Sequence, residues 1–307
     1  MAYRLSIADD VPSSVRACAR EQLGGAIERL ERAEEDPVEA VHDARKHVKK
    51  LRALLRLVRP ALGARAYRAE SAALRDVGRG LSATRDADVL VATVAALAQR
   101  FAGRLQAATF DGVRAALARS AGAPGEAAAE RATAIAELRA AAARVEEWPL
   151  EGAGWGTVVA GIARAYRRGR EAGTAAEEEP TAERLHEWRK RVKDLWYHER
   201  LLAPAWPAVI GAHGEEAHVL SELLGEEHDL AVLRERLDGG GLAPAPAVEA
   251  ELPALAELVE ERRAELREQA RRLGRRLYAE SPKAFARRIE RCVAAAVAET
   301  RALPPAR

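Results

Sequence analysis

The chain has 307 residues, of which 48% are apolar, 31% are charged and only 4% are aromatic. Its 49 basic and 47 acidic residues leave a net charge of +2, which excludes a uniform polycation and requires that any polyanion bind where charge is locally segregated. Two isolated cysteines, Cys18 and Cys292, exclude a disulfide framework, and no apolar run approaches the roughly 20 residues of a transmembrane helix. Because the N-terminus also lacks a signal-peptide layout, we expect a cytoplasmic protein with no membrane partner.

Apolar residues recur at intervals of three and four along most of the chain, and strand-like alternation is scarce. With the abundance of Ala, Leu and charged residues, this periodicity predicts an all-α fold. Breaks rich in Pro and Gly divide the chain into helices of roughly 15–25 residues. In chain order, the clearest helices are expected over residues 12–33, 37–59, 156–172 and 181–203.

The order of elements repeats half a chain later. In each half, a first helix is followed by an acidic break and then by a basic helix that ends at Pro60 or Pro204. A Gly-rich segment over 148–156 separates the halves, so we expect two four-helix bundles, over 1–150 and 151–307. The third helix of each half is expected to carry a related motif, Leu81-x-x-x-Arg85-Asp86-x-x-Val89-Leu90 or Leu224-x-x-x-His228-Asp229-x-x-Val232-Leu233.

The two basic helices share the pattern His-x-x-Arg-Lys-x-x-Lys and the cations that follow it. Over the 15 residues from His42 to Arg56 and from His186 to Arg200, the segments are identical at seven positions. The first stripe comprises His42, Arg45, Lys46, Lys49, Arg52 and Arg56. The second comprises His186, Arg189, Lys190, Lys193, Tyr197 and Arg200.

At 100° per residue, each stripe lies within an arc of about 120°, opposite the apolar face of its helix. No Asp or Glu falls inside either arc, although like charges at this spacing repel one another. A solvated polar face is the alternative for a single basic helix, but duplication of the stripe favours a bound anion. About 14 residues span roughly 21 Å, which suits a linear polyanion better than a single phosphate. Lys50, at 80°, is expected to lie outside the arc and to matter less than Lys49.

Other chemistry has weaker support. His42 and His186 are suited to donating a hydrogen bond to a phosphate oxygen, but equally to packing at helix crossings. The cluster from Glu226 to Asp229 lacks the spacing of a metal site, and no nucleotide-binding or nucleophile motif is present. We therefore predict no catalytic residue, metal or cofactor. A metal-dependent phosphohydrolase that uses the histidines and this cluster is the alternative, and nucleic-acid binding is disfavoured because few aromatic residues accompany the stripes.

The paired motifs resemble the CHAD domain (conserved histidine α-helical domain) over about residues 5–295, and the segment from Ala163 to Arg170 is also similar. The resemblance implies two four-helix bundles related by a pseudo-twofold axis, with a basic cavity between them. It implies non-catalytic binding of inorganic polyphosphate and association with polyphosphate granules, while leaving the oligomeric state open. The implied binding residues are both stripes together with Arg85 and His228.

Two departures from the repeat distinguish the halves. Trp196 stands where the first half has Arg52, and Glu222 stands where it has Arg79. The second half therefore carries less positive charge, and we expect the first half to bind more strongly.

Overall fold

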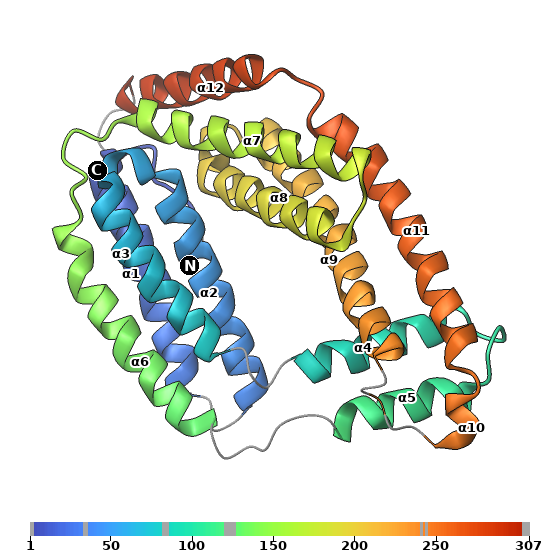
Figure 1. The fold of residues 1–307 in the computed structure, drawn as a ribbon. Coiled ribbons are helices and arrows are strands. Elements are labelled where there is room, and N and C mark those ends of the chain that lie inside the picture. The colour runs from blue at the N-terminus through green and yellow to red at the C-terminus, as the bar shows by residue number, and fades with distance from the viewer. Residues whose placement is uncertain are drawn as a thin grey trace.

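A computed structural model describes residues 3–32, 36–81, 86–119, 127–239, 242 and 245–302. Within these ranges the chain is built of helices and has no β-strand, which confirms the all-α prediction (Figure 1). The helices are α1 (Val11–Glu31), α2 (Pro37–Leu57), α3 (Arg59–Gly80), α4 (Asp86–Arg100), α5 (Ala107–Arg119), α6 (Ala127–Arg144), α7 (Trp155–Glu178), α8 (Ala182–Leu202), α9 (Ala212–Asp238), α10 (Pro246–Glu249), α11 (Leu252–Leu277) and α12 (Pro282–Ala302).

The two stripe helices, α2 and α8, begin and end close to the predicted residues. Asp36 caps α2 by accepting a hydrogen bond from the Glu39 N–H at 3.0 Å, and Pro37 occupies the first turn. Thr181 caps α8 in the same way. No helix in the described part of the chain is both long and apolar enough to span a membrane.

The third-helix motif differs between the halves. In the second half it lies wholly within α9. In the first half Leu81 is the C-cap of α3 and Asp86 opens α4, so the prediction of one continuous helix is wrong there. Gly78 and Gly80 precede this break, whereas Ser221 and Leu223 stand at the matched positions of α9. Glycine weakens a helix interior and favours its C-terminal end, which accounts for the difference.

Two hydrophobic cores organise the described helices. The larger combines residues of α1, α2, α3, α6, α7, α8 and α12 with the first half of α9 and the end of α11. The smaller combines α4 and α5 with the end of α9 and with α11, as in the packing of Leu97 and Phe110 with Leu233 and Leu255. First-half helices thus share a core with second-half helices. The repeat boundary at 150 and the pseudo-twofold axis stay predictions.

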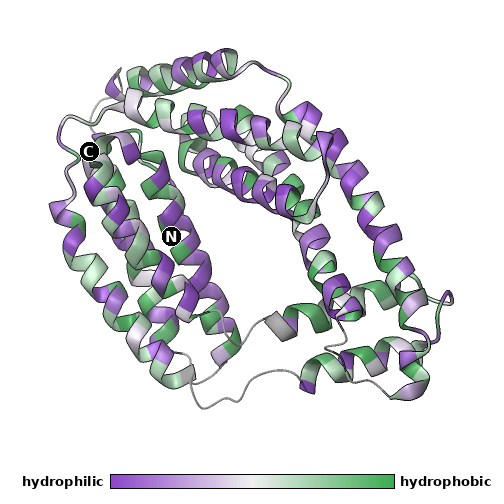
Figure 2. Ribbon diagram, viewed as in Figure 1, coloured by the Kyte–Doolittle hydropathy of each residue, from purple (hydrophilic) through white to green (hydrophobic). Residues whose placement is uncertain are grey.

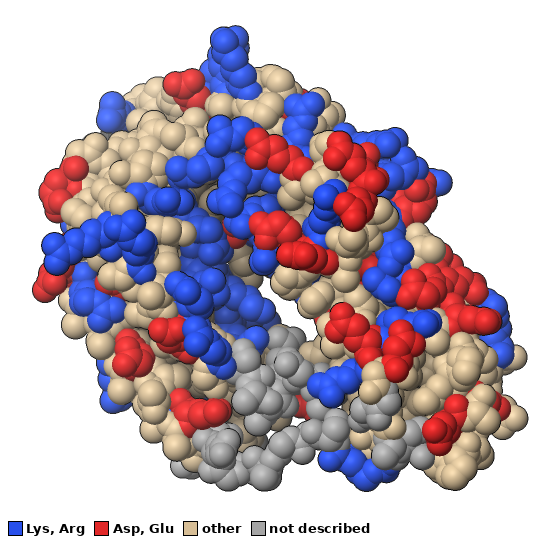
Figure 3. Space-filling view, viewed as in Figure 1, with Lys and Arg blue, Asp and Glu red and all other residues tan. Residues whose placement is uncertain are grey.

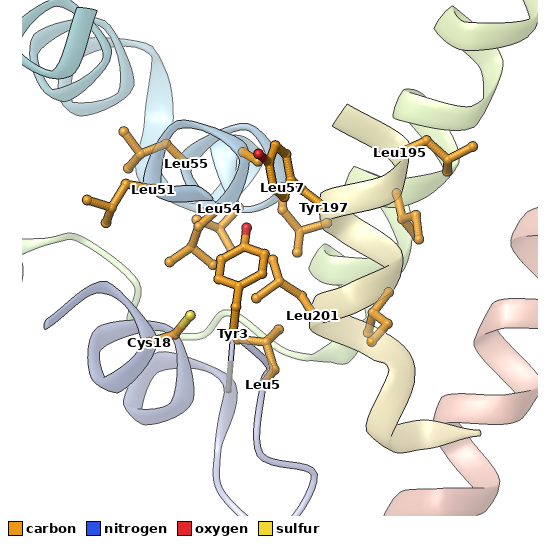
Figure 4. Packing of buried hydrophobic residues seen from close by; sticks show 14 of the residues in the cluster. Tyr3, Leu5, Cys18, Leu51, Leu54, Leu55, Leu57, Leu195, Tyr197 and Leu201 are labelled. Carbon is orange, nitrogen blue, oxygen red and sulfur yellow. The ribbon is translucent and has the colours of Figure 1, made fainter. Parts of the chain in front are cut away.

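The crossing of α2 and α8 brings the stripe helices together inside the larger core. Leu54 and Leu57 of α2 pack near Leu201 of α8, and Tyr3 of the N-terminal segment inserts beside them (Figure 4). The buried His198 ring donates from Nε2 to the Ala53 carbonyl at 2.9 Å, so a side chain of α8 is bonded to the backbone of α2. The outward faces of both helices are largely hydrophilic (Figure 2).

Candidate functional site

A cavity of about 1000 Å³ lies where the two cores meet, between α2, α8, α4, α9 and α11. One wall is cationic and comes from both stripe helices. Figure 3 shows Lys and Arg side chains gathered around the central hollow of this face. The helix α2 contributes His42, Lys46, Lys49 and Lys50, and α8 contributes Arg189, Lys193 and Arg200.

Three of these cations have no carboxylate within 4 Å among the described residues: Lys50, Arg189 and Arg200. The Arg189 Nε atom is buried without a hydrogen-bond partner in the described part of the chain. Its guanidinium packs against Gly225, where an added Cβ would lie 3.2 Å from Arg189 Nη2, so glycine makes room for the side chain. Burial, reinforced by Arg200, lowers the pKa of Lys50 below its usual value. The wall therefore holds positive charge that its described neighbours do not neutralise.

Aromatic side chains pack around the Arg200 guanidinium. The Arg200 guanidinium lies 5.3 Å from the Trp196 ring centre and 5.7 Å from that of Tyr3. Trp196 stacks on His218, with ring centres 4.1 Å apart, and on Tyr197 at 4.6 Å. Burial raises the pKa of Tyr197 to about 12, so its hydroxyl is a neutral hydrogen-bond donor at physiological pH.

The opposite wall is different in character. The helix α4 lines it with small and apolar side chains, among them Ala92, Ala96 and Leu97. Carboxylates reach the cavity only from α9 in the part of the chain that the structure describes, as Glu222, Glu226 and Asp229. Glu226 accepts two hydrogen bonds from Arg262, at 2.7 and 2.9 Å. One wall is thus suited to an anion, and the other limits the width of the cavity.

Three predicted residues of α2 do not line the cavity. Arg45 donates to the Leu81 carbonyl at 2.9 Å and the Gly78 carbonyl at 3.3 Å, so it caps the C-terminal end of α3. Arg56 pairs with the buried Asp194 at 2.7 Å, across the α2–α8 crossing. Arg52 lies on an adjacent face of α2, where burial and the charges of Arg56 and Arg75 lower its pKa.

Three predicted residues of α8 and α9 also lie outside the cavity lining. Lys190 is exposed and pairs with Glu187 at 2.7 Å. His186 and His228 stack on each other with ring centres 4.3 Å apart. Burial, with smaller contributions from His228 and neighbouring cations, lowers the pKa of His186 to about 4, so the ring is neutral at pH 7. The predicted Arg85 lies outside the described residues.

Lys50 lies outside the predicted stripe, yet it lines the cavity together with Lys49. That it matters less than Lys49 for binding stays a prediction. The cavity meets α2 from His42 to Lys50 rather than at the centre of the predicted arc. The Tyr3 hydroxyl donates to the Lys50 carbonyl at 2.8 Å, and the Tyr3 ring lies 5.8 Å from the Lys50 ammonium. Sequence periodicity predicts the polar face of a helix. It does not predict which part of that face borders the cavity, because this also depends on contacts with a segment far away in sequence.

The acidic cluster of α9 packs against arginines of α11. Glu227 is buried and pairs with Arg263 at 2.9 Å and with Arg267 at 3.1 Å. Among the described residues, no group of three or more His, Cys, Asp or Glu is placed to hold a metal ion. Salt bridges to arginine give Glu226 and Glu227 a structural role between α9 and α11.

Comparisons with known proteins identify the family of this chain. The crystal structure of the CHAD domain from the plant Ricinus communis is similar to this chain, with 19% sequence identity and a TM-score of 0.49, over 99% of this chain and 94% of that one. A comparison with curated proteins gives no match. The sequence model of the CHAD domain matches residues 17–238. Since this match covers well over half of the sequence, the chain belongs to the CHAD domain family.

Proposed function

We propose that the protein binds inorganic polyphosphate in the cavity between α2 and α8 and does not hydrolyse it. The observation that carries this proposal is the set of cations with no carboxylate partner among the described residues, Lys50, Arg189 and Arg200, on one wall of the cavity. Partly buried positive charges that repel one another are stabilised when an anion enters. Arg supplies paired donors to phosphate oxygens and Lys supplies a point charge.

The distribution of charge favours a linear polyanion over a single phosphate. Seven basic side chains from two crossing helices face one cavity of about 1000 Å³, whereas the whole chain has a net charge of only +2. Orthophosphate would contact few of these groups at once. A chain of phosphates would contact many and release counterions as it binds, which makes affinity depend steeply on salt.

A titration with four ligands at two salt concentrations tests the proposal. Long-chain polyphosphate should bind tightest, triphosphate less tightly, and orthophosphate and duplex DNA weakly. The polyphosphate affinity should fall steeply between the two salt concentrations. Equal affinity for duplex DNA and polyphosphate would refute the proposed selectivity.

Absence of catalysis is part of the proposal. Glu226, which lines the cavity from α9, and the buried Glu227 beside it are engaged by arginines of α11, which supports a structural role rather than metal binding. Incubation of the protein with polyphosphate and Mg²⁺ or Mn²⁺ should release no phosphate above background. Release that disappears in Glu227→Gln or His228→Ala would favour the phosphohydrolase alternative.

Base stacking has little support. Single-stranded nucleic acids bind on open aromatic faces. Here the Trp196 ring already stacks on His218 and on Tyr197, and these contacts compete with stacking by a base. Association with polyphosphate granules in cells would follow from the proposed binding, and co-localisation of the tagged protein with granules tests it.

A further inference from the structure

A second group of cations lies outside the cavity, on α2, α3 and α7. Two of its members are half-buried, Arg52 and Arg164, and the rest are exposed. Tyr67 sits among them, with the Arg59 guanidinium 4.9 Å from its ring centre. Arg164 donates from Nη2 to the Arg56 carbonyl at 3.3 Å, which fixes α7 against the end of α2. We name this group the arginine track, and it comprises Arg52, Arg59, Arg75, Arg164 and Arg168.

In the part of the chain that the structure describes, no acidic side chain forms an ion pair with the arginine track. Among the described residues, none of its five members lies within 4 Å of a carboxylate. Asp194, the acidic side chain that acts on Arg52, is held by Arg56 at 2.7 Å and by Arg191 at 3.3 Å. Burial and neighbouring arginines lower the pKa values of both Arg52 and Arg164. The charges therefore repel one another in the absence of an anion.

Arginines elsewhere in this protein behave differently. On α11, Arg262, Arg263 and Arg267 each pair with glutamates of α9 or of α11 itself. The composition also supplies nearly one acid for each base. A cluster of five arginines with no acidic partner in the described part of the chain is thus a local feature of one surface and not a consequence of overall charge.

The track is continuous with the cavity along α2. Lys49 lines the cavity, and Arg52 follows three residues later, about 4.5 Å further along the helix axis and on the adjacent face. Figure 3 shows a nearly unbroken band of Lys and Arg from α7 along α2 to the central hollow. An extended polyanion that leaves the cavity beside Lys49 therefore meets the track next.

We propose that the arginine track holds the part of a long polyphosphate chain that extends beyond the cavity, so that the protein selects long chains over short ones. This inference rests on the proposed function and deepens it. The cavity alone contacts a short chain, whereas the track adds contacts only when the chain is long enough to reach α3 and α7. A single-stranded nucleic acid is the competing occupant, and the experiment distinguishes it.

The test compares long-chain polyphosphate with triphosphate on two charge-matched double variants. Arg75→Ala with Arg168→Ala removes two exposed members of the track, which keeps the risk to folding low. Arg287→Ala with Arg291→Ala removes two exposed arginines of α12, which line a separate hollow near Trp206. Both double variants lower the net charge by the same amount. A difference in affinity between them therefore reports where the charges lie and not how many there are.

The track variant should lower the affinity for long-chain polyphosphate by about 5- to 30-fold and leave that for triphosphate within about twofold. The slope of log affinity against log salt for the long chain should become shallower by roughly 0.7 for each phosphate that the variant no longer binds. The α12 variant should bind both ligands with nearly the same affinity as the wild-type protein.

Three outcomes would overturn the inference. In the first, the track variant loses as much affinity for triphosphate as for long-chain polyphosphate. In the second, the α12 variant loses as much affinity for long-chain polyphosphate as the track variant does. In the third, single-stranded DNA binds the wild-type protein as tightly as polyphosphate does, and it binds the track variant more weakly than it binds the wild type. Failure of the proposed function is distinct, because wild type would then bind neither polyphosphate ligand.

Discussion

The two stripe helices carry the same motif but present different parts of it to the cavity. The helix α2 uses His42, Lys46, Lys49 and Lys50, whereas α8 uses Arg189, Lys193, Tyr197 and Arg200. Within these two described helices, Lys49 and Lys193 are the only matched pair of stripe positions that lines the cavity from both sides. The repeated motif therefore specifies a cationic helix, and the packing of each helix decides which of its cations face the ligand.

Matched positions consequently have different roles. Arg45 caps α3, while its match Arg189 lines the cavity. Lys50 lines the cavity, while its match Asp194 is a buried anion that pairs with Arg56. Substitutions at matched positions can thus separate stability from binding.

The largest effect is expected at Asp194. Replacing it by Asn removes the buried carboxylate that pairs with Arg56, while Arg191 keeps Glu187, and should lower the free energy of unfolding by about 2–4 kcal/mol. Lys50→Ala should change it by less than about 0.5 kcal/mol, because it removes a charge that its neighbours repel. Denaturant unfolding measures both, and a decrease of less than about 1 kcal/mol for Asp194→Asn would contradict the role assigned to this residue.

The next largest effect is a difference in polyphosphate affinity between variants of two lysines of α2. Lys50 is half-buried and has no carboxylate within 4 Å among the described residues, whereas Lys46 is exposed and pairs with Asp43 at 3.0 Å. Lys50→Ala should weaken binding by about 1.5–3 kcal/mol, the usual contribution of a charged hydrogen bond. Lys46→Ala should weaken it by less than about 1 kcal/mol. Calorimetric titration of both variants checks the order, and a larger effect for Lys46→Ala would contradict it.

The first histidines of the stripes also differ, because His42 lines the cavity and His186 stacks on His228. The pKa of His186, about 4, lies below that of an unfolded histidine, so the unfolded state binds the extra proton first. Stability should therefore fall as the pH drops from about 6.5 towards 4.

Burial gives His47 and His198 similarly lowered pKa values of about 4, so they contribute to the same trend. His186→Gln should make the pH dependence shallower by at most about 1.4 kcal/mol per pH unit. Unfolding curves from about pH 7 to about pH 4 for both proteins measure the difference. An unchanged slope in the variant would mean that His186 keeps its ordinary pKa.

The smallest effect is expected at Glu222, which matches Arg79 of the first half. Its carboxylate lines the cavity and lies 3.8 Å from the Lys193 ammonium, with its side chain 64% exposed. Glu222→Gln removes a negative charge from the site and should raise polyphosphate affinity by about two- to fivefold at low salt. The gain should disappear at high salt, where such charges are screened. A decrease in affinity would mean that Glu222 positions Lys193 for binding.

Much of the fold could be predicted from the sequence, because local signals determine it. The Asp36 and Pro37 signature places the start of α2, and apolar periodicity gives the buried faces of α2 and α8. The packing of α4 and α5 against α9 and α11 could not be predicted, since it joins segments far apart in the chain. Lys50 was missed for the same reason, because Tyr3, far away in sequence, fixes how that part of α2 is exposed.

The different roles of the two stripe helices are tested most directly by the affinity of long-chain polyphosphate for Arg189→Ala and Arg45→Ala, measured in one buffer. Both variants remove an arginine from the same position of the repeated motif. Arg189→Ala should weaken binding by about 10- to 100-fold with little change in stability. Arg45→Ala should lower stability by about 1–2 kcal/mol, because α3 is no longer capped, and should change affinity less than about threefold. Equal decreases of affinity in the two variants would contradict the binding role of Arg189.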